Sequence, residues 1–177
     1  MRYFAAIASL LLLAACNNTG NKLTETKDST SIKTVATVTI APNFKDPKVA
    51  DIYSKYILLK DELVNTKFAE AKTAAKSLAV ALQSYSGCEN TALTANKIEA
   101  STGIAAQRVA FTALSTDVIA LFKHADFDKG AIYVQHCPMA NKGDGGDWLS
   151  SQKEIRNPYY GDQMMECGAV VEVINAK

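Results

Sequence analysis

The strongest constraint on the fold is the spacing of apolar residues between Asp46 and His124. They recur there every three or four positions, which is the period of one face of an α-helix. Asp46 followed by Pro47 is typical of a helix start, because aspartate caps free backbone N–H groups and proline suits the first helical position. The sequence predicts three long helices, over residues 47–64, 66–85 and 104–124.

The first two of these helices are expected to pack against each other. Only a short polar connection joins them, which favours an antiparallel hairpin. The alanines of the second helix favour helix formation and let a neighbouring helix approach closely. Residues 86–103 are less regular, and a short helical piece is expected around residues 92–99.

The C-terminal third has a weaker pattern. Residues 132–134 are β-branched or aromatic and are expected to be extended. After the turn residues of 157–161, a last helix is predicted from about Asp162, with one apolar face formed by Met164, Cys167, Val171 and Ile174. A strand over residues 169–174 is the alternative, because valine-rich runs fit both structures. The predicted fold is mainly α, a small up-and-down bundle of about four helices with an irregular or extended segment before the last helix.

The N-terminus predicts export and a membrane anchor. A short basic start is followed by ten apolar residues, too few to span a bilayer and typical of a signal peptide. The run ends in Leu13-Ala14-Ala15-Cys16, which resembles a bacterial lipobox, with lipid on the Cys16 sulfur. The alternative is an ordinary signal peptide with a chance cysteine. We expect a signal peptide over 1–15, a lipidated cysteine and flexible tether over 16–45, and a single domain over 46–177.

The charge balance argues against one class of partner. The chain has 19 basic and 18 acidic residues, and removing residues 1–15 takes away one basic residue. A domain without net charge has no electrostatic reason to bind nucleic acid. We therefore expect contact with the membrane through the N-terminal lipid, a location in the cell envelope facing the periplasm, and no nucleic-acid partner.

Sulfur-containing residues form the most distinctive candidate site. Cys137 and Met139 flank Pro138, and Met164 and Cys167 follow about thirty residues later. Thiolates and thioethers are soft donors that suit Cu(I) or a similar ion. His136 is a further candidate ligand, although in an extended segment it would point away from its neighbour Cys137.

Two other interpretations of these sulfur residues remain open. With Cys16 assigned to lipid, the remaining thiols are Cys88, Cys137 and Cys167, which allow one disulfide at most. Cys137 and Cys167 are the natural pair. The methionines and cysteines are otherwise ordinary core residues, since methionine often fills gaps in a core.

Catalysis is not expected. The sequence has no phosphate-binding loop and no dinucleotide fingerprint. The adjacent residues His136 and Cys137 are sequence neighbours, whereas catalytic dyads are assembled in space. The glycine-rich segment 142–147 lacks the ligand pattern of a calcium loop and is expected to be a surface turn.

Five segments stand out along the chain: YILLKDELV (56–64), QRVAFTALS (107–115), YVQHCPMA (133–140), WLS (148–150) and EIRNPYYGDQMMECG (154–168). Together they resemble a bacterial domain of unknown function, and the resemblance extends over roughly residues 53–171. This domain is common in Bacteroidetes, as a lone lipoprotein or appended to periplasmic adaptor subunits of heavy-metal efflux pumps.

The resemblance implies a helical bundle that handles metal, without catalysis. Its sulfur positions fall on Cys137, Met139, Met164 and Cys167, whereas His136 stands where many relatives are expected to have an aromatic residue. The Cys-Pro-Met unit also resembles short heavy-metal-binding domains with Tyr-x-Cys-Pro-Met-His, but Ala140 replaces the final histidine here.

These observations give two hypotheses about function. The first is a lipid-anchored envelope protein that binds a soft metal ion, foremost Cu(I), in heavy-metal efflux or resistance, with an efflux adaptor or pump as partner. The second is a protein-interaction module of the cell envelope that binds no metal and is stabilised by a Cys137–Cys167 disulfide.

Overall fold

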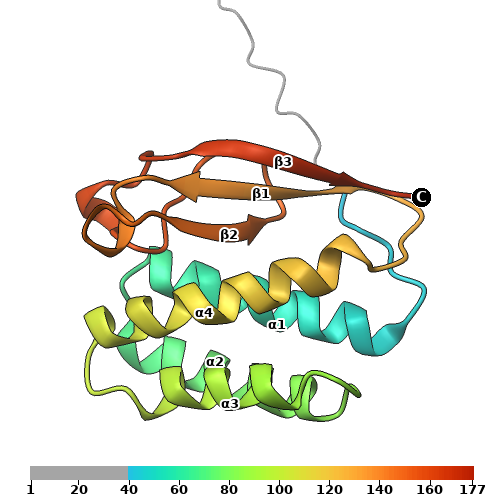
Figure 1. The fold of residues 1–177 in the computed structure, drawn as a ribbon, viewed down its shortest axis with the longest axis horizontal. Coiled ribbons are helices and arrows are strands. Elements are labelled where there is room, and N and C mark those ends of the chain that lie inside the picture. Colours follow the sequence, from blue (N-terminus) through green and yellow to red (C-terminus); the bar gives the residue numbers. More distant parts are fainter. Residues whose placement is uncertain (1–39) are drawn as a thin grey trace, which may run out of the picture. The chain divides into compact units, whose positions relative to one another are not determined.

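The computed structural model describes residues 40–177, which form three layers (Figure 1). The middle layer holds α1 (Pro47–Val64) and α4 (Ile104–Lys123). A three-stranded sheet covers one side of it, and α2 (Phe68–Gln83) and α3 (Glu89–Ala100) cover the other. The predicted signal peptide, the Cys16 lipidation site and most of the predicted tether lie outside the described residues.

The three long predicted helices and the short helix expected around residues 92–99 are confirmed. The side chain of Asp46 caps α1 by accepting a hydrogen bond from the Lys48 backbone N–H at 2.8 Å, and Pro47 is the first helical residue. The helix expected around 92–99 is longer than predicted and begins at Glu89. The helical half of the fold therefore follows the periodicity of the sequence.

Helix α4 is the most apolar of the described helices, and its place between two layers explains part of this. By length and composition alone it is the one described helix that would also suit a membrane span. It packs between α3 on one side and β2 on the other. Its buried residues include Phe111, Leu114 and Val118. A helix covered on two sides needs a wide apolar surface, which accounts for the buried apolar residues of α4.

The prediction that the chain ends in a helix is wrong. The sheet consists of β1 (Ala131–Cys137), β2 (Gly146–Ser150) and β3 (Ala169–Asn175), all antiparallel and in the order β2-β1-β3. The alternative of a strand over 169–174 matches β3, and the extended segment 132–134 lies within β1. Strand β2 was not predicted. The fold is thus four helices followed by an antiparallel sheet, and not a purely helical bundle.

The C-terminal strand has a physical reason to form. Central strand β1 offers backbone hydrogen-bonding groups on both edges, and a valine-rich run pairs there favourably. Gly168 enters β3 with a φ of 148° and lies so close to β1 that a Cβ would stand 2.7 Å from the His136 carbonyl oxygen. Only glycine fits both demands. The predicted helix is reduced to a short 3-10 turn, η2 (Gly161–Gln163).

Tyr56 joins the helices to the sheet. Its side chain is fully buried in α1, and its hydroxyl is 2.7 Å from the Ser115 hydroxyl of α4. The Leu149 backbone N–H of β2 donates to the same oxygen at 3.2 Å. Burial raises the pKa of Tyr56 well above its usual range, so the phenol stays neutral. The Tyr56 hydroxyl thus links α1 to both α4 and β2 by hydrogen bonds.

Candidate functional site

The two sulfur-rich segments meet in the structure. Cys137 is the last residue of β1 and is fully buried, and Cys167 is half-buried two residues before β3. Their Sγ atoms are 3.1 Å apart, and both cysteines are free thiols. The sheet order explains the contact, because β3 pairs with β1 and the chain entering β3 passes the end of β1.

Asn157 fixes the segment that carries Cys167. It is fully buried, its side-chain amide donates to the Cys167 carbonyl at 3.0 Å, and its backbone N–H donates to the Met165 carbonyl at 2.9 Å. Its side-chain oxygen accepts from the Tyr159 backbone N–H at 2.8 Å. The sequence indicated Asn157 and Pro158 only as a turn. A buried asparagine that bonds three backbone groups is a positioning residue for the thiol.

The two methionines occupy different environments from the cysteines. The Met139 side chain is 53% exposed, and its backbone carbonyl accepts a hydrogen bond from the Tyr160 hydroxyl. Met164 is half-buried at the end of η2. It does not share a helical face with Cys167, because no helix forms there. The structure therefore brings the two thiols together, with the thioethers on the same two segments.

His136 is engaged elsewhere. Its Nδ1 lies 2.8 Å from Asp147 Oδ1, the residue opposite it on β2. Strand alternation turns its side chain to the other face from Cys137. Gly145 packs against the imidazole so closely that a Cβ there would stand 2.7 Å from Cε1. The structure thus separates His136 from the thiol pair.

The Cys167 thiol favours the protonated form at neutral pH. The hydrogen bond with Cys137 is the main cause that raises the pKa of Cys167, and desolvation adds to it, while the Met139 backbone acts in the opposite direction. Burial also raises the pKa of Cys88, which precedes α3 in the helical layer. Binding of a metal ion to the Cys167 sulfur must therefore release the thiol proton.

A hydrogen-bond donor without a partner lies near the two cysteines. Trp148 on β2 is fully buried, and its Nε1 has no hydrogen-bond partner. Its ring packs edge-on against Tyr159 at 6.0 Å and lies beside Gly168. Within residues 40–177, no three His, Cys, Asp or Glu side chains gather as a possible metal site. A metal at the thiol pair would be held by the two sulfurs, and any further ligand would come from the thioethers or from solvent.

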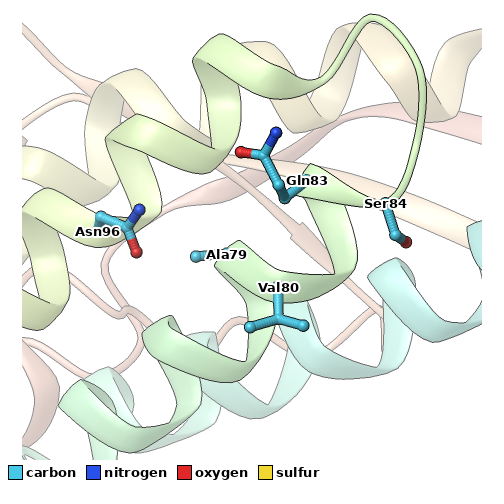
Figure 2. Close-up of a pocket in the computed structure, with 5 residues that line it drawn as sticks. All are labelled: Ala79, Val80, Gln83, Ser84 and Asn96. Atoms are coloured by element: carbon cyan, nitrogen blue, oxygen red, sulfur yellow. The ribbon is translucent and has the colours of Figure 1, made fainter.

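Another concavity lies away from the sheet. Figure 2 shows a pocket between α2 and α3, lined by neutral side chains that include Val80, Gln83 and Asn96. Both helices lie on the opposite side of the middle layer from the sheet (Figure 1). The pocket contains no charged or sulfur ligand, so it adds nothing to the chemistry of the thiol pair.

Comparison with known proteins gives one match. Residues 52–130 match a family described as "Protein of unknown function (DUF3347)". No curated protein and no solved structure matches the chain. The matched range covers the four helices beyond the first turns of α1, and two of the five resembling segments, 56–64 and 107–115, lie inside it. The thiol pair lies outside it. The match covers less than half of the chain, and residues 52–130 are thus similar to a domain of unknown function.

Proposed function

We propose that this chain is a lipid-anchored protein of the cell envelope that binds a soft metal ion, foremost Cu(I), through Cys137 and Cys167. The 3.1 Å contact between their sulfurs is the observation that carries the proposal. Two thiolates on adjacent backbone segments are a soft donor pair, which selects ions such as Cu(I) over hard cations. The buried position of Cys137 protects a bound ion from water.

Metal binding needs a small rearrangement. A thiolate–metal bond is about 2.3 Å long for zinc, so a linear sulfur–metal–sulfur unit spans roughly 4.6 Å. The two sulfurs must therefore move apart from their present contact. Cys167 belongs to an irregular segment after η2, whereas Cys137 is fixed in the central strand, so the movement falls on Cys167.

The methionines are the proposed additional ligands. Met139 is exposed and its side chain is free to turn toward an ion, and Met164 lies three residues before Cys167. Thioethers match the softness of the thiolates. His136 is a weaker ligand in this proposal, because its imidazole contacts Asp147.

The proposed location and role follow from the sequence. The lipobox-like Cys16 supports a lipid anchor, and the resemblance to domains appended to efflux adaptors supports a role in heavy-metal efflux or resistance. A tethered site near an efflux adaptor or pump would raise the local concentration of bound metal there. Catalysis is not part of the proposal.

The same contact supports a second candidate, a disulfide-stabilised interaction module. A disulfide S–S bond is about 2.05 Å long, so closing it requires the sulfurs to approach by about 1 Å. The bridge would span thirty residues, and the chain-entropy estimate for such a loop is about 3–4 kcal/mol of stabilisation. In this candidate the bridge is structural, and the surface of the protein binds an envelope partner.

One experiment separates the two candidates. The full chain carrying Cys16→Ser is isolated without reductant, and its free thiols are counted by mass spectrometry after alkylation. The protein is then reduced and titrated with Cu(I) under anaerobic conditions against a competing chelator. The metal proposal expects one equivalent bound, a loss of affinity of about 100-fold or more in Cys137→Ser or Cys167→Ser, and no change in Cys88→Ser.

Two outcomes would reject the metal proposal. One is a complete Cys137–Cys167 bridge in freshly isolated protein together with no Cu(I) uptake after reduction. The other is an equal loss of affinity in Cys88→Ser, which would show binding to any thiol.

A further inference from the structure

A polar pocket lies between the end of α1 and the chain that leaves β2. Its volume is about 240 Å³. Three lining residues come from α1 and its cap, and four follow from the end of β2. They are Lys60, Asp61, Asn65, Ser150, Ser151, Gln152 and Arg156. Every lining side chain is polar and three are charged, whereas the pocket of Figure 2 is lined by neutral side chains.

Lys60 is an unusual residue for its place in α1. It stands one helical turn after Tyr56, on the buried face of the helix, and is 4% exposed. An ammonium group has three N–H donors, and a buried charge is costly unless it is paired and hydrogen-bonded. Its recorded partner is the carboxylate of Asp61, whose side chain is 46% exposed. The Lys60 ammonium group therefore keeps N–H donors available to a ligand in the pocket.

Arg156 adds a second positive charge. It is exposed, and no acidic side chain in residues 40–177 forms an ion pair with it. Its guanidinium offers a planar fork of donors that matches the oxygens of carboxylate or phosphate. With one carboxylate against two cations, the lining carries a net charge of about +1. The lining thus favours an anion.

Neutral donors complete the lining. The hydroxyl oxygen of buried Ser150 accepts a hydrogen bond from the Gln152 backbone N–H at 3.1 Å, which leaves the hydroxyl proton free to be donated. Ser151 and Asn65 supply a further hydroxyl and a side-chain amide. An oxygen-rich ligand would find donors on both walls.

The wall after β2 is held in place before any ligand binds. The side-chain amide of buried Gln135 on β1 lies 2.9 Å from the Gln152 carbonyl and 3.0 Å from the Glu154 carbonyl. It also reaches the Lys153 carbonyl at 3.3 Å. A site whose backbone is already ordered loses less entropy on binding.

We propose that this pocket binds a small oxyanion with phosphate, sulfate or carboxylate oxygens. A water molecule occupies about 30 Å³ in the liquid, so the volume holds an anion of phosphate size with several waters. Lys60 provides the buried charge, Arg156 provides the bidentate contact at the mouth, and the serine hydroxyls orient the remaining oxygens. The proposal is independent of metal binding, because none of the lining residues belongs to the thiol pair.

The test uses the full chain with Cys16→Ser at low ionic strength. Backbone amide NMR shifts are followed during separate titrations with inorganic phosphate, sulfate and acetate, and with chloride as a control for ionic strength. We expect saturable shifts confined to residues 60–65 and 150–156. Preference for phosphate and sulfate over acetate identifies a tetrahedral anion, and the reverse order identifies a carboxylate.

Variants decide whether the pocket is responsible. Arg156→Gln should weaken binding about tenfold or more, since it removes charged hydrogen bonds, and Lys60→Met should abolish it. Lys153→Gln removes an exposed charge from the same segment and should change affinity less than twofold. If Lys60→Met fails to fold, the affinity of Arg156→Gln by itself decides whether the pocket binds the anion. Equal weakening by Lys153→Gln, or shifts that do not saturate and match those with chloride, would overturn the proposal.

Discussion

The helical half and the sheet half of this protein are specified in different ways. In the helical half, buried apolar residues repeat along α1, α2 and α4, and the elements follow from that spacing. In the sheet half, single residues decide the structure: Gln135 holds the wall after β2, Asn157 holds the Cys167 segment, and Gly168 lets β3 approach β1. Packing in the helical half is shared among many residues, whereas each polar anchor of the sheet half acts alone. The predictions below test that difference.

The largest effect is expected where the two halves share one side chain. Phe111 of α4 is fully buried, stacks on Tyr56 at 5.5 Å and contacts Tyr159 of the sheet half at 5.9 Å. Phe111→Ala should lower the free energy of unfolding by about 3–5 kcal/mol, measured by urea denaturation. Val109→Ala, an exposed position on the same helix, should change it by less than about 0.5 kcal/mol. A loss below about 1 kcal/mol in Phe111→Ala would show that the halves are not coupled through this ring.

Asn157→Ala should damage the sheet half selectively. It removes the acceptor of the Tyr159 N–H and the donor to the Cys167 carbonyl, at a cost of about 2–3 kcal/mol. Hydrogen exchange should accelerate around residues 157–168 and stay slow in α2 and α3. The variant should also bind Cu(I) more weakly, because Cys167 is no longer held beside Cys137. Uniformly faster exchange in both halves would contradict the distinction between them.

Tyr56→Phe tests a polar anchor inside the helical half. The change leaves the Leu149 N–H and the Ser115 hydroxyl without the phenol oxygen. We expect a loss of about 1–2 kcal/mol in thermal denaturation. Tyr85→Phe serves as the matched control, because Tyr85 is half-buried and its hydroxyl forms no hydrogen bond with another residue of 40–177. Equal effects in the two variants would assign the loss to general packing.

The smallest predicted effect concerns pH and the thiol pair. Since the folded pKa of Cys167 is raised, its hydrogen bond to Cys137 stabilises the reduced protein fully below the pKa of an unfolded thiol. That contribution is lost as the pH rises through the raised folded pKa. Alkylation of Cys167 at pH 8, followed by mass spectrometry, should be slower than in Cys137→Ala, where the main cause of the shift is absent. Equal alkylation rates in the two proteins would show that the hydrogen bond with Cys137 does not slow the reaction of Cys167.

The sequence predicted the helices better than it predicted the site. Helices depend on local spacing, so their ends fall within a few residues of the predicted ones except at α3. The prediction of a final helix is wrong because the segment after Gly168 fits the apolar spacing of a helix and of a strand. Pairing with the edge of β1, which lies far away in the sequence, makes it a strand. Strand β2 was missed because its start at Gly146 follows a glycine-rich stretch that resembles a turn. The proximity of Cys137 and Cys167 was a hypothesis from residue type, and only the sheet order makes it a contact.

The sheet order also has a consequence for biogenesis. Cys137 ends the central strand, but its neighbour Cys167 arrives only with the last strand of the chain. If the chain is exported as proposed, Cys88 and Cys137 reach an oxidising compartment before Cys167. A disulfide formed between them at that stage would tie the helical layer to the end of β1. Pairing of Cys137 with Cys167 would then depend on delayed oxidation or on thiol–disulfide exchange that releases the early bridge.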